Sequence, residues 1–220
     1  MASEELIRFH AIIGTEQQNA DVVDALLKFR KTLFADTLGW ILDVHNGRER
    51  DQFDTAAAVH CALFEGTRLI GGFRAIRTDG DYLARSVFPH LAALRDFPQR
   101  PDVWEISRFG VLPGEERRIA AKLNYSLMFH FARWRGATSL VAVVDLTYER
   151  FLKVLGIRTR RYGPPQVIGR NARGAPMWAV AGEIPLAEQT DPRFHALLGL
   201  AKQVEIEHDT MVLRRRRVSA

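Results

Sequence analysis

Apolar residues recur at helical spacing between Ala20 and Thr37, and this periodicity predicts an amphipathic helix. Asn19 or Asp21 is suited to cap its N-terminus. The apolar face has two adjacent stripes, one of Val22, Leu26, Phe29 and Leu33 and the other of Val23, Leu27, Arg30 and Phe34. Arg30 therefore lies where a hydrophobic residue is expected. Because burying an ion costs roughly several kcal/mol, Arg30 needs an anionic partner.

Two apolar runs, 56–64 and 69–76, flank a Glu65–Gly66 turn and predict a β-hairpin. The polar segment before them, 42–55, is predicted to be a loop. Side chains alternate between the faces of a strand, so Arg74 shares a face with apolar residues of the second run. Arg74 is thus a second charge on a predicted apolar face.

A third strand is predicted over 103–112, where Glu105 and Arg108 interrupt an apolar run. In a regular strand, side chains three positions apart point to opposite faces. A bulge would bring both to one side, and bulges are common beside active sites. The irregular segment before this strand, 79–99, contains a short predicted helical piece near 90–94.

Helices and strands alternate in the second half of the chain. A long helix is predicted from Pro113 to about Arg135, with a buried face of Ile119, Leu123, Leu127, Phe131 and Trp134. An apolar, central strand over 139–144 follows, then a helix over 148–155, strands near 167 and over 177–182, and a terminal helix over 192–207. We expect an α/β fold with helices on both faces of a mixed sheet, in a single domain, 1–207, followed by a basic tail, 208–220.

The composition fits one domain of 220 residues, of which 47% are hydrophobic. The formal net charge of +5 favours acidic partners such as nucleic acid, a phosphorylated cofactor or an acidic carrier protein. Cys61 is the sole cysteine, so an internal disulfide is excluded, and the histidines lack metal-ligand spacing. No apolar run approaches the ~20 residues that span a bilayer, and we identify no secretory signal. We therefore expect a cytoplasmic protein with no metal site and no membrane partner.

The charges on apolar faces have candidate partners in the polar loop, namely Glu49, Asp51 and Asp54. One interpretation is a structural ion network that fixes the loop to the sheet. The other is a polar pocket for a charged small molecule, and the two overlap because a network can shape a pocket. Phe34 is expected in the core, whereas Trp40 suits either the core or the cover of a ligand.

A basic cluster surrounds the end of the helix over 148–155, and it consists of Arg150, Lys153, Arg158, Arg160 and Arg161. Such a cluster is either a solvated face or a docking site for an acidic protein. The tail carries a further run, Arg214–Arg217, whose sequence gives only weak support for nucleic-acid binding. Because the aromatic residues fall mostly at predicted core positions, a nucleic-acid partner is disfavoured.

The unusual residues occur in a characteristic order: Arg30, Phe34 and Trp40 in RKTLFADTLGW, Glu49, Asp51 and Asp54 in ERDQFD, Arg74 in GGFRAIRT, and Glu105 with Arg108 in WEISRFGV. On these residues the chain resembles the autoinducer synthases, which are the acyl-homoserine-lactone synthases of bacterial quorum sensing. The resemblance covers roughly residues 5–185.

The resemblance implies an N-acetyltransferase-like α-β-α sandwich around a twisted mixed sheet. It implies transfer of an acyl group from acyl carrier protein or acyl-CoA to the amine of S-adenosylmethionine, followed by lactone closure and release of methylthioadenosine. Neither step calls for a cofactor beyond these substrates. The eight residues other than Glu105 would form the S-adenosylmethionine pocket, and Glu105 would be the catalytic base, since burial in an apolar strand raises a carboxyl pKa.

The acyl chain is expected between the sheet and the helix over 113–135, near Met128, Val141, Ala142 and Val143. Ala142 stands where family members that prefer 3-oxo chains have a hydroxyl residue, which weakly disfavours a 3-oxo substrate. The basic cluster around Arg150–Arg161 would dock the acidic carrier protein. An ordinary N-acetyltransferase using acetyl-CoA is the alternative. It needs a glycine-rich turn at a helix start, and PGEERRIAAK at 113–122 is a poor match.

Overall fold

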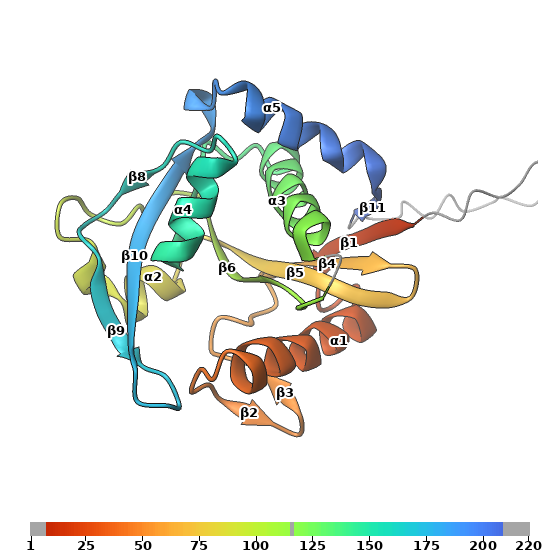
Figure 1. The fold of residues 1–220 in the computed structure, drawn as a ribbon, viewed down its shortest axis with the longest axis horizontal. Coiled ribbons are helices and arrows are strands. Elements are labelled where there is room, and N and C mark those ends of the chain that lie inside the picture. The colour runs from red at the N-terminus through yellow and green to blue at the C-terminus, as the bar shows by residue number, and fades with distance from the viewer. Residues whose placement is uncertain (1–7, 115–116, 209–220) are drawn as a thin grey trace, which may run out of the picture.

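The computed structural model describes residues 8–114 and 117–208, in which helices pack on both faces of one large sheet (Figure 1). Of the predicted tail only His208 is described, so Arg214–Arg217 lies outside the described residues. Within the two described ranges, no helix combines the length and the apolar character needed to cross a bilayer.

The helices are α1 (Ala20–Arg30), continued by the π-helix η1 (Lys31–Thr37), α2 (Leu83–Val87), α3 (Arg117–Trp134), α4 (Leu146–Val154) and α5 (Pro192–Gly199), with 3₁₀ turns at η2 (Pro89–Leu91), η3 (Leu186–Glu188) and η4 (Leu200–Gln203). The large sheet contains β1 (Phe9–Thr15), β4 (Val59–Glu65), β5 (Arg68–Arg77), β6 (Val103–Val111), β7 (Ser139–Asp145), β8 (Arg160–Arg161), β9 (Gln166–Arg170), β10 (Pro176–Pro185) and β11 (Glu205–His208). Its order is β11-β1-β4-β5-β6-β7-β10-β8, with β9 also paired to β10. The short strands β2 (Val44–His45) and β3 (Arg48–Glu49) pair with each other.

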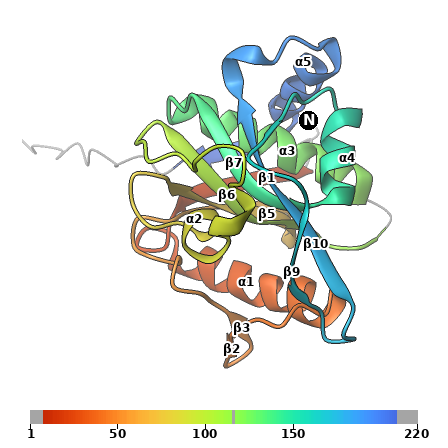
Figure 2. The same cartoon turned by 90° about the vertical axis from the view of Figure 1, so that its left-hand side faces the viewer.

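The sheet is mixed and covered on both faces, as predicted. Parallel pairing joins β1 to β11 and β6 to β7, while the neighbours along β1-β4-β5-β6 are antiparallel. Figures 1 and 2 show α1 on one side of the sheet and α3, α4 and α5 on the other. The main core lies under α3 and α4, whereas α2 packs on the opposite face over Ile76, Val103 and Val141. The predicted α-β-α sandwich is confirmed.

A bulge in β6 gives the sheet its main local irregularity. Gly72 of β5 pairs with Gly110, and Arg74 pairs with Ser107, so β6 has one more residue than β5 between these pairs. Arg108 has a φ of 52°, in the left-handed region that a non-glycine residue rarely adopts. The predicted bulge is therefore present, and it turns Arg108 to the face on which Arg74 and Ser107 lie.

Several predicted boundaries were wrong. The segment 42–55 is not wholly a loop, because β2 and β3 form a small hairpin inside it. The helical piece expected near 90–94 begins earlier, as α2 and η2. The terminal helix stops after η4, and the chain then pairs β11 with β1, a strand that the pattern did not predict. Trp134, expected on the buried face of α3, is 37% exposed and packs against His208.

Candidate active site

The end of the first helix presents two stacked aromatic rings. The π-helical turn of η1 leads to Gly39, and the amide of Trp40 donates to the carbonyl of Phe34 at 2.9 Å. The rings of Phe34 and Trp40 then stack, with centroids 4.9 Å apart. Phe34 is 2% exposed and Trp40 is 36% exposed. Phe34 therefore belongs to the core, as predicted, while Trp40 presents a ring face that a ligand can contact.

Gly110 lets this helix approach the sheet closely. A Cβ atom at Gly110 would overlap Leu33 Cδ2 and lie 3.3 Å from Phe34 Cζ. Gly72, its partner across the strands, is constrained in the same way by Leu26 and by the carbonyl of Cys61. The two glycines thus place the Phe34–Trp40 stack directly over the bulged part of β6.

The predicted charges meet in a closed ring of three arginines and three carboxylates, in the order Arg30, Glu49, Arg108, Asp51, Arg74, Asp54 and back to Arg30. We call this arrangement the ion ring. Arg30 donates to Glu49 at 2.5 Å and to both oxygens of Asp54 at 2.7 and 2.8 Å. Every carboxylate bridges two arginines, so charges alternate around the ring.

The other two arginines complete the ion ring from the sheet. Arg74 donates to both oxygens of Asp51, at 2.5 and 3.0 Å, and lies 2.8 Å from Asp54. Arg108 donates through Nη2 to Glu49 and Asp51, both at 2.8 Å. The bulge makes this possible, because a regular strand would point Arg108 to the other face.

The charged side chains of the ion ring are largely buried, so each of them needs a partner of opposite charge. Arg30 is 2% exposed and Arg74 and Glu49 are fully buried. Burial alone would raise the pKa of Asp54, but the hydrogen bonds and charge of Arg30 outweigh it and hold that pKa well below its usual value. The pKa values of Glu49 and Asp51 are lowered in the same way, against burial, chiefly by Arg108 and Arg74 respectively. The carboxylates stay ionised at neutral pH and the ion ring is neutral overall.

Glu105 lies outside the ion ring, fully buried at the start of α2. Its carboxylate accepts the backbone N–H groups of Leu83 at 2.9 Å and Ala84 at 2.6 Å. Burial raises its pKa to about 7, and the two N–H donors only partly oppose this. A carboxyl group that titrates near neutrality can accept a proton during catalysis. It also holds the first turn of α2, a contact that sequence reasoning did not identify.

Two further polar residues support the site. Ser107, which was not among the predicted site residues, accepts a hydrogen bond from Arg74 Nε at 3.1 Å. Its place two residues after Glu105, on the same strand face, was the available signal. Asn124 of α3 is fully buried and donates to the carbonyls of Gly72 and Gly110, at 3.1 and 3.3 Å. It holds the bulge from the opposite face, and no local pattern could have indicated that.

The four expected acyl-chain residues do not line one pocket between the sheet and α3. Met128 belongs to the core under α3. Val141 lies on the opposite face, in the cluster with α2, and Val143 packs against that cluster. Because side chains alternate along a strand, Ala142 lies on the same face of β7 as Leu140. This is the face that packs against α3. The predicted location between the sheet and α3 was therefore wrong for Val141 and Val143, because it ignored the alternation of side chains along β7.

β6 and β7 separate from each other part-way along their length, and we call this separation the gap between β6 and β7. The parallel pairing runs only from Val103–Glu105 and Ser139–Val141, although β6 continues to Val111 and β7 to Asp145. The two strands therefore part just after Glu105, beside the bulge.

The basic cluster is exposed, as a docking surface requires, but much of its charge is compensated. Arg161 pairs with Glu149 at 2.6 Å, and Arg160 and Arg158 both approach Glu188. Arg150 and Lys153 have no carboxylate within ion-pair distance among the described residues. These two are therefore the cations of the cluster whose charge is least compensated.

The chain is similar in sequence to proteins of one family. A family model described as "Autoinducer synthase" matches residues 14–183. An acyl-homoserine-lactone synthase of Aeromonas salmonicida is 33% identical over 164 residues, covering 71% of this chain and 79% of that protein. The isovaleryl-homoserine lactone synthase of Bradyrhizobium diazoefficiens is 30% identical over 201 residues, covering 89% and 88%.

Solved structures of other proteins have the same fold as this chain. The CoA-dependent acyl-homoserine lactone synthase BjaI, solved with SAM and isopentyl-CoA, aligns with a TM-score of 0.76 at 23% identity, covering 90% of this chain and 93% of that one. A candidate N-acetyltransferase from Lactobacillus plantarum aligns with a TM-score of 0.55 at 20% identity, covering 81% and 98%. The N-acetyltransferase-like fold is thereby confirmed, and the family match with the identity to the curated relatives shows that this chain belongs to the autoinducer synthase family.

Proposed function

We propose that this chain is an acyl-homoserine-lactone synthase that acylates the amine of S-adenosylmethionine and then closes the lactone. The observation that carries the proposal is the ion ring together with the Phe34–Trp40 stack on the continuation of the helix that bears Arg30, with the titratable Glu105 on the same bulged strand as Arg108. An aromatic face over a polar floor suits a substrate that has a sulfonium, an adenine and a zwitterionic amino acid end. Membership of the autoinducer synthase family supports it.

The ion ring would act as a preformed floor rather than as six separate ligands. Side chains of Arg30, Glu49, Asp54 and Arg74 are at most 3% exposed, whereas Asp51 is 13% and Arg108 is 8% exposed. Because the buried members are fully paired with each other, they fix the geometry. We assign contact with the ammonium and carboxylate ends of S-adenosylmethionine to Asp51 and Arg108, the edge that reaches solvent.

The first step is attack of the methionine amine on the acyl thioester, in which the amide C–N bond forms, the thioester C–S bond breaks and the carrier or CoA leaves as a thiol that takes up the proton. A free α-amine has a pKa of about 7.7–8.0, so at neutral pH most of it must lose a proton before attack. Glu105, with a pKa of about 7, is matched to accept that proton. Because Glu105 is fully buried and its oxygens already accept two backbone N–H groups, we propose that the proton travels through a water molecule. Backbone N–H groups near 107–109 would stabilise the tetrahedral oxyanion.

The second step is displacement of the sulfonium by the methionine carboxylate. The C–S bond breaks, the C–O bond of the lactone forms, and the sulfur keeps the electron pair as neutral methylthioadenosine. A neutral thioether needs no acid to leave, so the site has only to hold the substrate in a ring-closing conformation. The chemistry proposed for both steps requires no metal or redox cofactor.

The acyl donor would enter through the gap between β6 and β7, next to Glu105. Either acyl carrier protein or acyl-CoA fits this geometry, and BjaI was solved with isopentyl-CoA. The exposed Arg150 and Lys153 favour an acidic carrier protein. If the carrier is the donor, Arg150→Glu with Lys153→Glu should lower kcat/KM for acyl carrier protein substrates and leave that for acyl-CoA unchanged. Equal effects on both donors would contradict carrier docking at this cluster.

The direct test of the activity is mass spectrometry of medium from a heterologous host. An N-acyl-homoserine lactone that appears only when the chain is expressed supports the synthase and identifies the acyl group. If no lactone appears, while the purified chain binds acetyl-CoA and acetylates amines, the protein is an ordinary N-acetyltransferase.

A further inference from the structure

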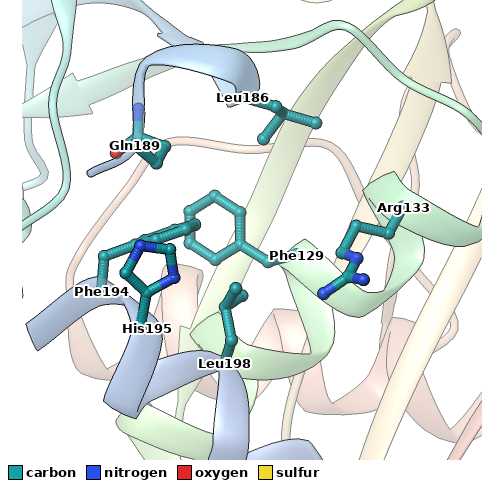
Figure 3. A pocket seen from close by; sticks show the side chains of 7 residues that line it. All are labelled: Phe129, Arg133, Leu186, Gln189, Phe194, His195 and Leu198. Carbon is teal, nitrogen blue, oxygen red and sulfur yellow. The ribbon is translucent and has the colours of Figure 1, made fainter. Parts of the chain in front are cut away.

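A pocket of about 280 Å³ lies between α3, α5 and the turn η3, outside the site described above. Figure 3 shows it bounded by Phe129 and Arg133 of α3, by Phe194, His195 and Leu198 of α5, and by Leu186. We propose that this pocket, named here the α3–α5 pocket, binds a small amphipathic carboxylate, such as a medium-chain fatty acid. It would do so independently of the acyl substrate.

The interior of the α3–α5 pocket is apolar and rigid. Phe129 and Phe194 are 1% and 5% exposed, and their rings meet edge to face with centroids 4.8 Å apart. The half-buried side chains of Leu186 and Leu198 border the same space. An apolar tail bound here would be transferred from water to packed apolar side chains. Such transfer into a preformed pocket is the usual basis of small-molecule binding.

The mouth of the α3–α5 pocket is cationic. The guanidinium of Arg133 is directed toward Phe129 and Leu198, and the ring of His195 stands on the opposite side of the opening (Figure 3). In the described part of the chain, no carboxylate lies within ion-pair distance of Arg133. Arginine presents a planar fork that matches a carboxylate, so an anionic head group is the complementary ligand.

The amide and carboxylate side chains near the pocket already have partners, so they neither hydrogen-bond a ligand nor neutralise the charge of Arg133. Gln189, on the pocket wall, uses its amide to donate to the carbonyls of Arg158 and Pro185 and to accept the Arg158 N–H. Asp191 is engaged by Arg193 at 2.7 Å, and Glu188 is engaged by Arg160. The wall is thus fixed by its own hydrogen bonds, and Arg133 remains the cation available to an incoming anion.

The α3–α5 pocket lies away from the residues proposed to carry the reaction. Arg133 lies at the C-terminal end of α3, whereas Asn124 in the middle of the same helix is the residue that reaches the bulge. The ion ring and Glu105 are on the opposite face of the sheet from α3. Loss of the pocket should therefore leave catalysis unchanged.

The test is calorimetric titration of sodium octanoate into the purified chain. Arg133→Glu should weaken binding roughly tenfold or more, since a hydrogen bond to a charged group is worth about 1.5–3 kcal/mol and about 1.4 kcal/mol is tenfold. Leu198→Trp, which fills the half-buried space, should weaken it as well. Lys202→Glu is the matched control, because it inverts an exposed cation just beyond α5 that does not line the pocket.

Three results would overturn the proposal. One is octanoate affinity that is the same in wild type and Arg133→Glu. A second is an equal loss in the Lys202→Glu control, which would mean non-specific charge attraction. The third is displacement of all the octanoate by an acyl thioester substrate, which would place it in the acyl site. Synthase turnover at saturating substrates should stay unchanged in all three variants, and octylamine should bind no better than buffer controls.

Discussion

At the scale of single residues, the site depends on Arg108, whose side chain reaches the ion ring only because one extra residue bends β6. Its φ of 52° is a strained conformation that its bonds to Glu49 and Asp51 maintain. Sequence phase was enough to predict that Arg30 and Arg74 would be buried. It could not predict that six charges would close into a ring, because the contacts span up to 59 positions of the chain.

Glu105→Gln tests the proton acceptor. Because glutamine cannot take the proton, kcat should fall by about 10²–10⁴-fold, and the limb of the pH–rate profile with an apparent pKa near 7 should disappear. Binding of methylthioadenosine should persist, since Glu105 lies outside the ion ring. Steady-state kinetics from about pH 5 to about pH 9, roughly two units either side of the titration, give the comparison. A variant with near-normal kcat would remove Glu105 from this role.

Asp51→Asn and Asp54→Asn separate substrate contact from structural pairing. Asp54 is buried against Arg30 and Arg74, so its loss should lower the free energy of unfolding by about 3 kcal/mol. Asp51 lies at the exposed edge of the ion ring, so its main effect should be a roughly tenfold rise in KM for S-adenosylmethionine. Urea unfolding and kinetics measure the two quantities.

Asp24, whose side chain is 35% exposed, is the control for this pair, because it too is held by two cations, Lys28 and Arg48. Asp24→Asn should lower the free energy of unfolding much less than Asp54→Asn does, because solvent screens the ion pairs of Asp24. Equal losses of stability at positions 51 and 54, with KM unchanged in both variants, would show that the ion ring is purely structural.

At the scale of elements, the close approach of α1 and η1 to β6 brings the aromatic stack to the strand that carries Arg108 of the ion ring. The hairpin β4–β5, the strand β6 and the helix α3 were predictable because local periodicity specified them. The strands β1 and β11 were not predicted. β11 is short, and its parallel partner β1 lies near the other end of the sequence, so no local pattern indicates the pair. The error on the location of Val141 had a different cause, since the alternation of side chains along β7 was enough to predict its face.

Gly110→Ala tests the close approach. The new methyl group would overlap Leu33 and crowd Phe34, so it should displace η1, lower stability by about 1–3 kcal/mol and weaken S-adenosylmethionine binding. Gly182→Ala is the matched control on β10, where a Cβ would meet only the carbonyl of Arg160 at 3.8 Å. Thermal unfolding and ligand titration compare them. Similar behaviour of the two variants would mean that the helix is not held by this contact.

At the scale of the whole molecule, stability should depend on pH in two separate windows. The pKa values of Glu49, Asp51 and Asp54 are lower in the folded protein than in the unfolded chain. These groups therefore add to the free energy of unfolding above their ordinary pKa values, near 4, and this stabilisation is lost as the pH falls through the folded-state values. The raised pKa of Glu105 has the opposite effect. Its contribution is present below its ordinary pKa and is lost as the pH rises through about 7.

Urea unfolding at a series of pH values checks both windows. Relative to wild type, Glu105→Gln should gain stability as the pH rises from about 5 to about 8, since only the wild type then ionises a buried carboxyl group. Asp54→Asn should remove part of the loss of stability in acid. Parallel pH curves for wild type and both variants would contradict these assignments.

The most direct test of the central claim is a reaction of the purified chain with an acyl thioester and S-adenosylmethionine labelled with ¹³C in the methionine carboxylate. We predict that mass spectrometry will find one N-acyl-homoserine lactone carrying the label for each methylthioadenosine released. Accumulation of acylated S-adenosylmethionine without lactone, or consumption of the thioester without any labelled product, would contradict the account.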